Sequence, residues 1–206
     1  MTGTPQRMPR SERRAMVLAR ASEGFMVHGF RSTSMDEIAH SIGVTKPVLY
    51  QHFASKEDLY LAVLGAIGER ALAAARALPP LPADEDERAR AALRWVRELT
   101  TERPDVRLVL SPELVSDPVS LMASRLRTEL AREISVALVG RDTLSDTAAV
   151  ALGRCLIALA GDEVHGRGSD LETDPESISR FIARGLSSIA ETPDGPRQQP
   201  DGLEVV

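Results

Sequence analysis

The segment 45–52, TKPVLYQH, gathers side chains of the kinds that contact nucleic acid. Hydroxyl, ammonium and imidazole groups can bind phosphate oxygens, whereas the amide of Gln51 can pair with adenine and the apolar Pro47 and Val48 can touch a thymine methyl. No acid or nucleophile is spaced to act with His52, so its pattern favours phosphate contact or packing over catalysis. The candidate phosphate contacts are Ser34, Thr45, Lys46, Tyr50, His52 and Lys56, with Thr33 at the margin of the set.

Two short helices are expected to position these side chains. Ser34 and Glu37, three residues apart, predict a capping box at the start of the first helix. Gly43 should end that helix, because glycine reaches the left-handed conformation cheaply. The second helix should run from Lys46 to His52, with Thr45 placed to cap it. Two short helices joined by a glycine-containing turn predict a helix-turn-helix; the alternative is an ordinary helical hairpin in an all-α core.

Residues 45–59 also carry a known family pattern, T-K-x-x-L-Y-x-H-F-x-x-K-x-x-L. Over about residues 11–65 the sequence resembles the DNA-binding region of the TetR family of bacterial transcription regulators, and beyond that it resembles the family only in its helical character. The resemblance implies a homodimeric, all-helical, ligand-responsive repressor that binds operator DNA, and it assigns Lys56 a phosphate contact. Many members have Gly or Ala at the position of Pro47, a departure that affects base preference more than function.

The charge of the chain is divided unevenly. Residues 1–56 hold eight Lys and Arg against four acids, a balance of +4. Since the net charge of the chain is −5, residues 57–206 carry −9. Positive potential would therefore lie where phosphates bind, unless the two halves differ by chance. A helix is predicted from about Ser11 to His28, with Gly29 ending it. Arg13 and Arg14 stand in its first turn, where the helix dipole disfavours cations, and this position is easier to understand if they face phosphate.

Composition limits the class of protein. Aromatic residues make up 3% of the chain, which suits helices better than a sheet. The single cysteine, Cys155, cannot form an intramolecular disulfide, and no Cys/His spacing predicts a zinc site. The sequence shows neither an apolar run long enough to span a membrane nor a secretory signal. We therefore expect a cytoplasmic protein without a membrane partner and without a cofactor.

The predicted fold is all-α and has two domains. Residues 1–10 should be a disordered arm or, alternatively, a basic arm that orders on DNA. Residues 11–55 should form a three-helix helix-turn-helix head, and 56–78 a connecting helix whose tilt would change the separation of two heads in a dimer. Residues 79–191 should form a helical ligand-binding and dimerisation domain, and 192–206 a disordered tail. The acids at 84–87 fit a helix N-terminus better than a metal site.

The middle helices supply apolar residues that could line an effector pocket. Met and Trp among aliphatic groups would suit a sizeable hydrophobic ligand, but each of these residues could equally belong to the plain core. The stretch 107–118, RLVLSPELVSDP, faintly resembles a region of family members that sense fatty acyl compounds. The candidate ligand-binding residues are Trp95, Leu99, Leu108, Leu114, Met122, Leu126 and Leu156.

The last two long helices are rich in small residues, which predicts a tightly packed helix pair. The family resemblance implies that this pair, doubled by symmetry, makes a four-helix dimer interface; the alternative is a monomer whose last helices only close the bundle. The candidate dimerisation residues are Ala149, Gly153, Ala160, Ile178, Phe181, Ile182, Gly185 and Ile189.

Two other functions remain open at this point. Asp162, Glu163 and His165 could form the site of a small all-helical enzyme, although the cluster lacks a further ligand group for a metal. The protein could also be a DNA-binding protein that responds to no ligand, in which case the C-terminal domain would hold no apolar cavity.

Overall fold

The computed structural model describes residues 9–78, 81–113, 115–140, 144–162, 180 and 182–184, and every regular element among them is helical. This confirms the predicted all-α fold. In chain order the elements are α1 (Arg10–Ser32), α2 (Met35–Ser41), α3 (Lys46–Tyr50), α4 (Lys56–Arg76), α5 (Glu85–Glu102), the 3₁₀ turn η1 (Pro104–Val106), α6 (Arg107–Leu110), α7 (Asp117–Val139) and α8 (Asp146–Asp162).

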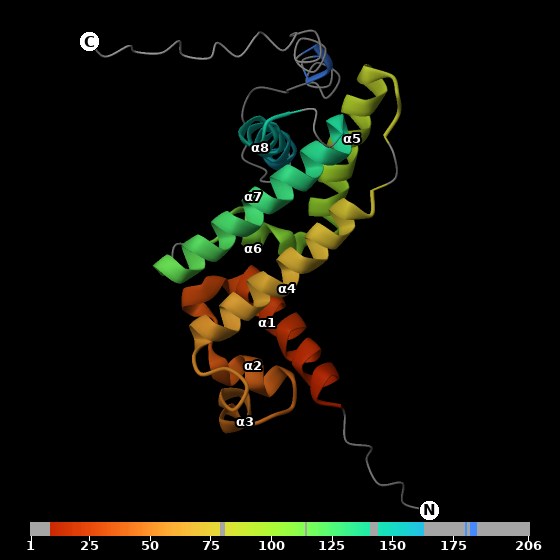
Figure 1. Cartoon of the computed structure of the whole chain (residues 1–206). Coiled ribbons are helices and arrows are strands. Elements are labelled where there is room, and N and C mark those ends of the chain that lie inside the picture. Colours follow the sequence, from red (N-terminus) through yellow and green to blue (C-terminus); the bar gives the residue numbers. More distant parts are fainter. Residues whose placement is uncertain are drawn as a thin grey trace, which may run out of the picture.

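Helices α1, α2 and α3 form a small head at one end of the molecule, and α4 leads from this head along the C-terminal body (Figure 1). In the body α7 lies between α4 and α8. The hydroxyl of Ser55 caps the start of α4 by accepting from the Asp58 amide, as Ser116 caps α7 by accepting from the Val119 amide. The head is therefore joined, through α4, to a body of long helices packed side by side.

Helix α1 extends four residues beyond its predicted end at His28. Gly29 has φ +75° and ψ 170°, so the helix bends there and one further turn follows. Thr33 closes that turn: its hydroxyl donates toward the carbonyl oxygens of Gly24 and Gly29. Gly29 thus marks a corner in α1, where the sequence alone predicts a helix end.

An aromatic cluster joins the head to α4. The ring of Tyr60 on α4 lies 4.8 Å from that of Phe25 and 5.2 Å from that of Phe30, between ring centroids, and Phe25 and Phe30 stack at 5.9 Å. Each such pair contributes about 0.5–1.5 kcal/mol beyond its buried area. Phe25 and Tyr60 are almost fully buried, so α1 and α4 share one continuous core.

Candidate nucleic-acid interface

The turn between α2 and α3 has the predicted capping box and glycine, but Thr45, although it is the N-cap residue of α3, makes no side-chain capping hydrogen bond. The Ser34 hydroxyl accepts from the Glu37 amide at 3.0 Å, and the Glu37 carboxylate accepts from the Ser34 amide at 3.1 Å. Gly43 has φ +69°, and the Val44 amide donates to the Ala39 carbonyl. The capping box and the glycine turn predicted from the sequence are both confirmed. The Ser34 hydroxyl acts only as an acceptor in the capping box, so its hydrogen can still be donated to another acceptor, such as a phosphate oxygen.

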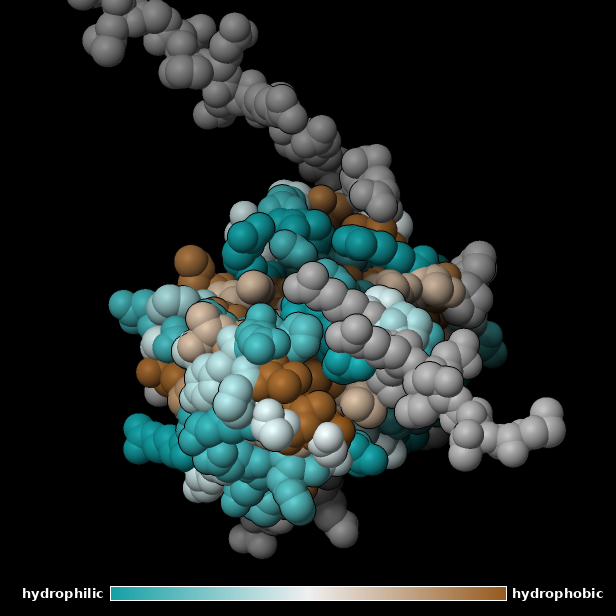
Figure 2. Space-filling model, turned by 90° about the horizontal axis from the view of Figure 1, so that it is seen from below, coloured by the Kyte–Doolittle hydropathy of each residue, from teal (hydrophilic) through white to brown (hydrophobic). Residues whose placement is uncertain are grey.

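Helix α3 buries one side and exposes the other. Leu49 is 0% and Phe53 5% exposed, whereas Tyr50 keeps 42% of its surface exposed. The helix ends at Tyr50 and not at His52, because Gln51 is its C-cap and only a turn follows. On the outer side Thr45, Lys46, Pro47 and Gln51 are exposed, and Val48 and His52 are half-buried. A space-filling view from this end shows a mainly hydrophilic surface with small hydrophobic areas (Figure 2).

Lys46 is paired with Asp36 across the turn. Its Nζ lies 2.6 Å from Asp36 Oδ2, and both side chains are about half exposed. Hydrogen bonding to Asp36 and the negative charge of its carboxylate raise the pKa of Lys46 above its usual value. The ammonium therefore stays charged, but a phosphate group must compete with Asp36 for it.

Removing that competitor should strengthen DNA binding. We expect Asp36→Asn to tighten binding to duplex DNA by about two- to fivefold at low salt, the effect of an exposed ion pair, because Lys46 is released and a charge that repels phosphate is lost. Fluorescence anisotropy with a labelled duplex measures this, with Asp58→Asn on α4 as a control that leaves Lys46 paired. Unchanged or weaker binding of Asp36→Asn would contradict the placement of Lys46 at the phosphate backbone.

Lys56 has partners within the protein. Its Nζ donates to the carbonyl oxygens of Phe30 at 2.8 Å, Arg31 at 3.2 Å and Thr33 at 3.0 Å. It also lies 4.5 Å from the centroid of the Phe30 ring. An ammonium group has three hydrogens, and the three carbonyls use them all. Within the subunit Lys56 therefore ties the end of α1 to the start of α4, and this use of its ammonium group argues against the phosphate contact predicted for it.

The Thr33 side chain also lies inside the protein. Thr33 is only 2% exposed and its hydroxyl closes α1, so it too is left out of the phosphate contacts.

Arg14 adds a positive charge to the head. Its guanidinium lies 5.1 Å from the centroid of the ring of Phe53, the third residue after the end of α3. The unfavourable position of Arg14 in the first turn of α1 was the signal for it in the sequence.

Comparison with known proteins supports the interpretation of this head. The family model described as "Bacterial regulatory proteins, tetR family" matches residues 17–63. The HTH-type transcriptional activator FasR of Mycolicibacterium smegmatis is 33% identical over 193 residues, which cover 90% of this chain and 88% of FasR. The chain belongs to the TetR family. It is a helix-turn-helix regulator of transcription that binds DNA, as the sequence predicted.

Other relatives of this TetR-family chain agree. The HTH-type transcriptional regulator TcmR of Streptomyces glaucescens is 34% identical over 119 residues, 55% of this chain and 52% of TcmR. The solved structure of a TetR-like transcriptional regulator from Rhodococcus sp. RHA1 is 27% identical and covers 88% of this chain and 99% of its own, with a TM-score of 0.57. GusR of Salmonella enterica, 21% identical, shares the fold with a TM-score of 0.65 over 90% of this chain and 98% of its own.

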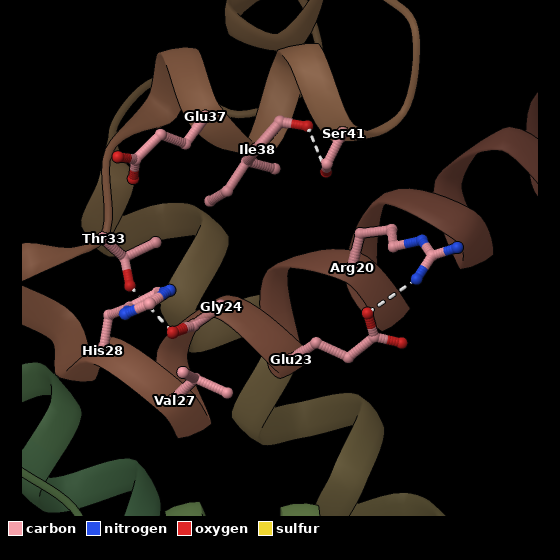
Figure 3. A pocket seen from close by; sticks show the side chains of 9 residues that line it. All are labelled: Arg20, Glu23, Gly24, Val27, His28, Thr33, Glu37, Ile38 and Ser41. Atoms are coloured by element: carbon pink, nitrogen blue, oxygen red, sulfur yellow. Dashed lines mark hydrogen bonds and ion pairs between the residues drawn. The ribbon is translucent and has the colours of Figure 1, made fainter.

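A hollow of about 350 Å³ lies on the flank of the TetR-type head, between α1 and α2 (Figure 3). Two pairs of its polar groups already have partners: Arg20 pairs with Glu23 at 2.7 Å, and the Ser41 hydroxyl donates to the Ile38 carbonyl. Val27 at its edge is 71% exposed. None of the predicted ligand-binding residues lines this hollow, which is therefore distinct from the predicted effector pocket.

The described members of the predicted effector site all belong to the core of this regulator. Leu99, Leu126 and Leu156 are at most 9% exposed. Trp95, Leu108 and Met122 are half-buried against the same core, and Leu114 lies outside the described residues. The body helices α5, α6, α7 and α8 contribute these six side chains.

Two of the predicted dimerisation residues instead pack inside the TetR-family subunit. A Cβ on Gly153 would overlap the carbonyl of Ala131, so this glycine lets α8 approach the backbone of α7. The carbonyl of Ala149 accepts from the buried Ser135 hydroxyl. These contacts correct the prediction, because sequence spacing does not show which neighbour a small residue faces.

Most of the other dimerisation candidates lie outside the described residues. Ile182 is 7% exposed and belongs to the core of its own chain, a further correction. The side chain of Ala160 lies outside the described residues, as do Ile178, Phe181, Gly185 and Ile189. The exposed side of α8 carries Ala151, Arg154, Cys155 and Ala158, and the Arg154 guanidinium donates to the Thr128 hydroxyl on α7 at 2.9 Å.

The alternative enzyme site falls mainly outside the described residues. Asp162 ends α8, and both Glu163 and His165 lie beyond it. Within the part of the chain that the structure describes, no three His, Cys, Asp or Glu side chains are grouped to hold a metal ion. Over the same part, no helix has the length and apolar character needed to cross a bilayer.

Proposed function

We propose that this regulator binds a palindromic operator as a homodimer and places α3 of each subunit in the major groove. The observation that carries the proposal is the two-sided character of α3: Leu49 is fully buried, whereas Lys46, Pro47 and Tyr50 point outward. A helix held by its core side and exposed along the other is what a major-groove contact requires. Operator DNA lies with the bacterial chromosome, so we place the protein in the cytoplasm.

The exposed side chains divide into two roles. Polar groups bind the backbone, set the register and supply the salt-sensitive part of the affinity, and three others contact base edges. We assign the first role to Ser34, Thr45, Lys46, Tyr50 and His52, and the second to Pro47, Val48 and Gln51.

Single substitutions separate the two roles. We expect Gln51→Ala to lose discrimination at one base pair of each half-site, worth about 1–3 kcal/mol. Its discrimination at the other base pairs should stay as in the wild type. Tyr50→Phe, which removes only the hydroxyl, should weaken binding to all sequences alike. Titrations against a bound duplex and its single-base variants measure both effects. An equal loss on every duplex for Gln51→Ala would refute its contact with a base.

For the dimer, we propose that the exposed side of α8, with Ala151, Cys155 and Ala158, contributes to the interface. These three small side chains would let the helices of two subunits approach closely, with the exposed Arg154 beside them. A twofold dimer would then hold its two α3 helices about 34–36 Å apart, or a multiple of that distance, on one face of the duplex.

For the effector, we propose a small hydrophobic molecule bound among the body helices that carry Trp95, Leu108 and Met122. Such a ligand can change DNA binding only if it favours one head spacing over another. The sequence predicts a repressor, and FasR is named an activator. Repression by this chain therefore stays a prediction, which transcription from a promoter carrying its operator would test.

A further inference from the structure

The loop between α6 and α7 reaches back to the head. The Phe30 amide at the corner of α1 donates to Glu113 Oε1 at 2.8 Å, across 83 residues of sequence. A hydrogen bond to a carboxylate is stronger than one between neutral groups. Glu113 therefore holds the backbone of the head directly from the C-terminal body.

The corner at Gly29 is shaped to admit this carboxylate. With φ +75°, residue 29 has a backbone conformation that favours glycine. A Cβ at this position would also overlap Glu113 Oε1 and lie 3.3 Å from its Cδ. The absence of a side chain at residue 29 thus serves both the bend in α1 and the contact with Glu113.

The same part of α1 is also held by α4. The Lys56 ammonium donates to the Phe30 carbonyl at 2.8 Å. Phe30 is therefore fixed through its amide by the body and through its carbonyl by α4. Next to Lys56, the Glu57 carboxylate accepts from the hydroxyl of Ser116, the cap of α7, at 2.7 Å. The loop before α7 therefore contacts both helices that carry the head.

Glu113 also lies beside the aromatic cluster. Burial raises the pKa of Tyr60, and the negative charge of Glu113 raises it further. The packing of Phe25, Phe30 and Tyr60 does not depend on the carboxylate, so the head should remain attached when Glu113 is replaced.

We propose that Glu113 is a positioning residue that fixes the orientation of the head on the body and thereby sets the half-site spacing that the regulator accepts. The proposal rests on the proposed binding of a dimer to a palindromic operator. Each head is joined to the dimer through its own body, so a looser joint lets the two α3 helices occupy a wider range of separations. The loss of Glu113 should then relax the spacing preference more than it lowers the affinity for a single half-site.

The test compares full-length Glu113→Ala with Glu113→Gln, whose side-chain oxygen can still accept from the Phe30 amide. Glu98→Ala, which removes an exposed acid on α5, is the matched control. The first readout is hydrogen exchange at the Phe30 amide, which should become about tenfold faster in Glu113→Ala, the effect of losing a charged hydrogen bond. The second is affinity for synthetic duplexes in which the gap between two selected half-sites is changed by one base pair in either direction.

We expect the preference of Glu113→Ala for the native gap to fall about tenfold, and the two other variants to keep the wild-type preference within about threefold. An unchanged spacing profile, or an equal loss at every gap, would overturn the role of Glu113. Wild-type protein that binds no duplex would instead overturn the proposed function, and the spacing role with it. The exchange measurement distinguishes the two cases, because it reports the contact between Glu113 and Phe30 without DNA.

Discussion

Replacing Gly153 with alanine is expected to lower the free energy of unfolding by about 2–4 kcal/mol, the cost of forcing a methyl group into a closely packed site. The added Cβ would overlap the backbone of Ala131, which cannot rotate away as a side chain could. Helix α8 would have to move off α7, with loss of packing around the buried Leu156. Denaturant unfolding at one fixed protein concentration measures the change, since dimerisation makes stability depend on concentration.

Gly65→Ala is the matched control for this prediction. Gly65 also lies inside a long helix, α4, but among the described residues nothing beyond its chain neighbours and the adjacent backbone of α4 lies within 4 Å of a Cβ built there. Alanine at this position should raise stability by about 0.5–1 kcal/mol, because it favours the helix and restricts the unfolded chain. Similar effects of the two substitutions would contradict the close approach of α8 to α7.

Lys56→Met is expected to lower the free energy of unfolding by about 2–4 kcal/mol, because it leaves three backbone carbonyls without their charged donor. Methionine keeps much of the stem length but cannot donate to Phe30, Arg31 or Thr33. The contact of the ammonium with the Phe30 ring is lost as well, at about 0.5–1 kcal/mol within that total. Thermal and denaturant unfolding measure the change.

The control is Lys46, which lies on α3 in the head, whereas Lys56 begins α4. Its partner Asp36 is exposed, so Lys46→Met should change stability by less than about 1 kcal/mol. It should instead weaken DNA binding and reduce the slope of affinity against salt by about one unit. If Lys56→Met were the variant with native stability and a reduced salt slope, the phosphate role assigned by the family resemblance would be restored.

These two lysines show which parts of the site could be predicted from the sequence. The capping box of Ser34 and Glu37 and the turn at Gly43 depend on residues a few positions apart, so the sequence alone predicts them and the structure confirms them. The partners of Lys56 lie 23 to 26 residues away, and only the folded head brings them to its ammonium group. A family pattern conveys that a lysine stands there without conveying what it binds in this chain.

The C-terminal body shows the same limit. The small residues Ala149 and Gly153 predict a close helix contact, and a close contact exists. Whether the neighbour is α7 of the same subunit or a helix of a second subunit depends on which side of α8 faces inward, and a helix that is apolar nearly all round does not indicate this. Similarly, the end of α1 was predicted at a glycine, but capping by Thr33 carries the helix one turn further.

Selection of bound sequences by wild-type protein from a pool of random duplexes at low salt tests the central claim most directly. A dimer that inserts one α3 helix per subunit should enrich an inverted repeat, with half-site centres about 10 base pairs apart or at a multiple of that separation. No enriched sequence, or a single half-site with no symmetric partner, would contradict the account.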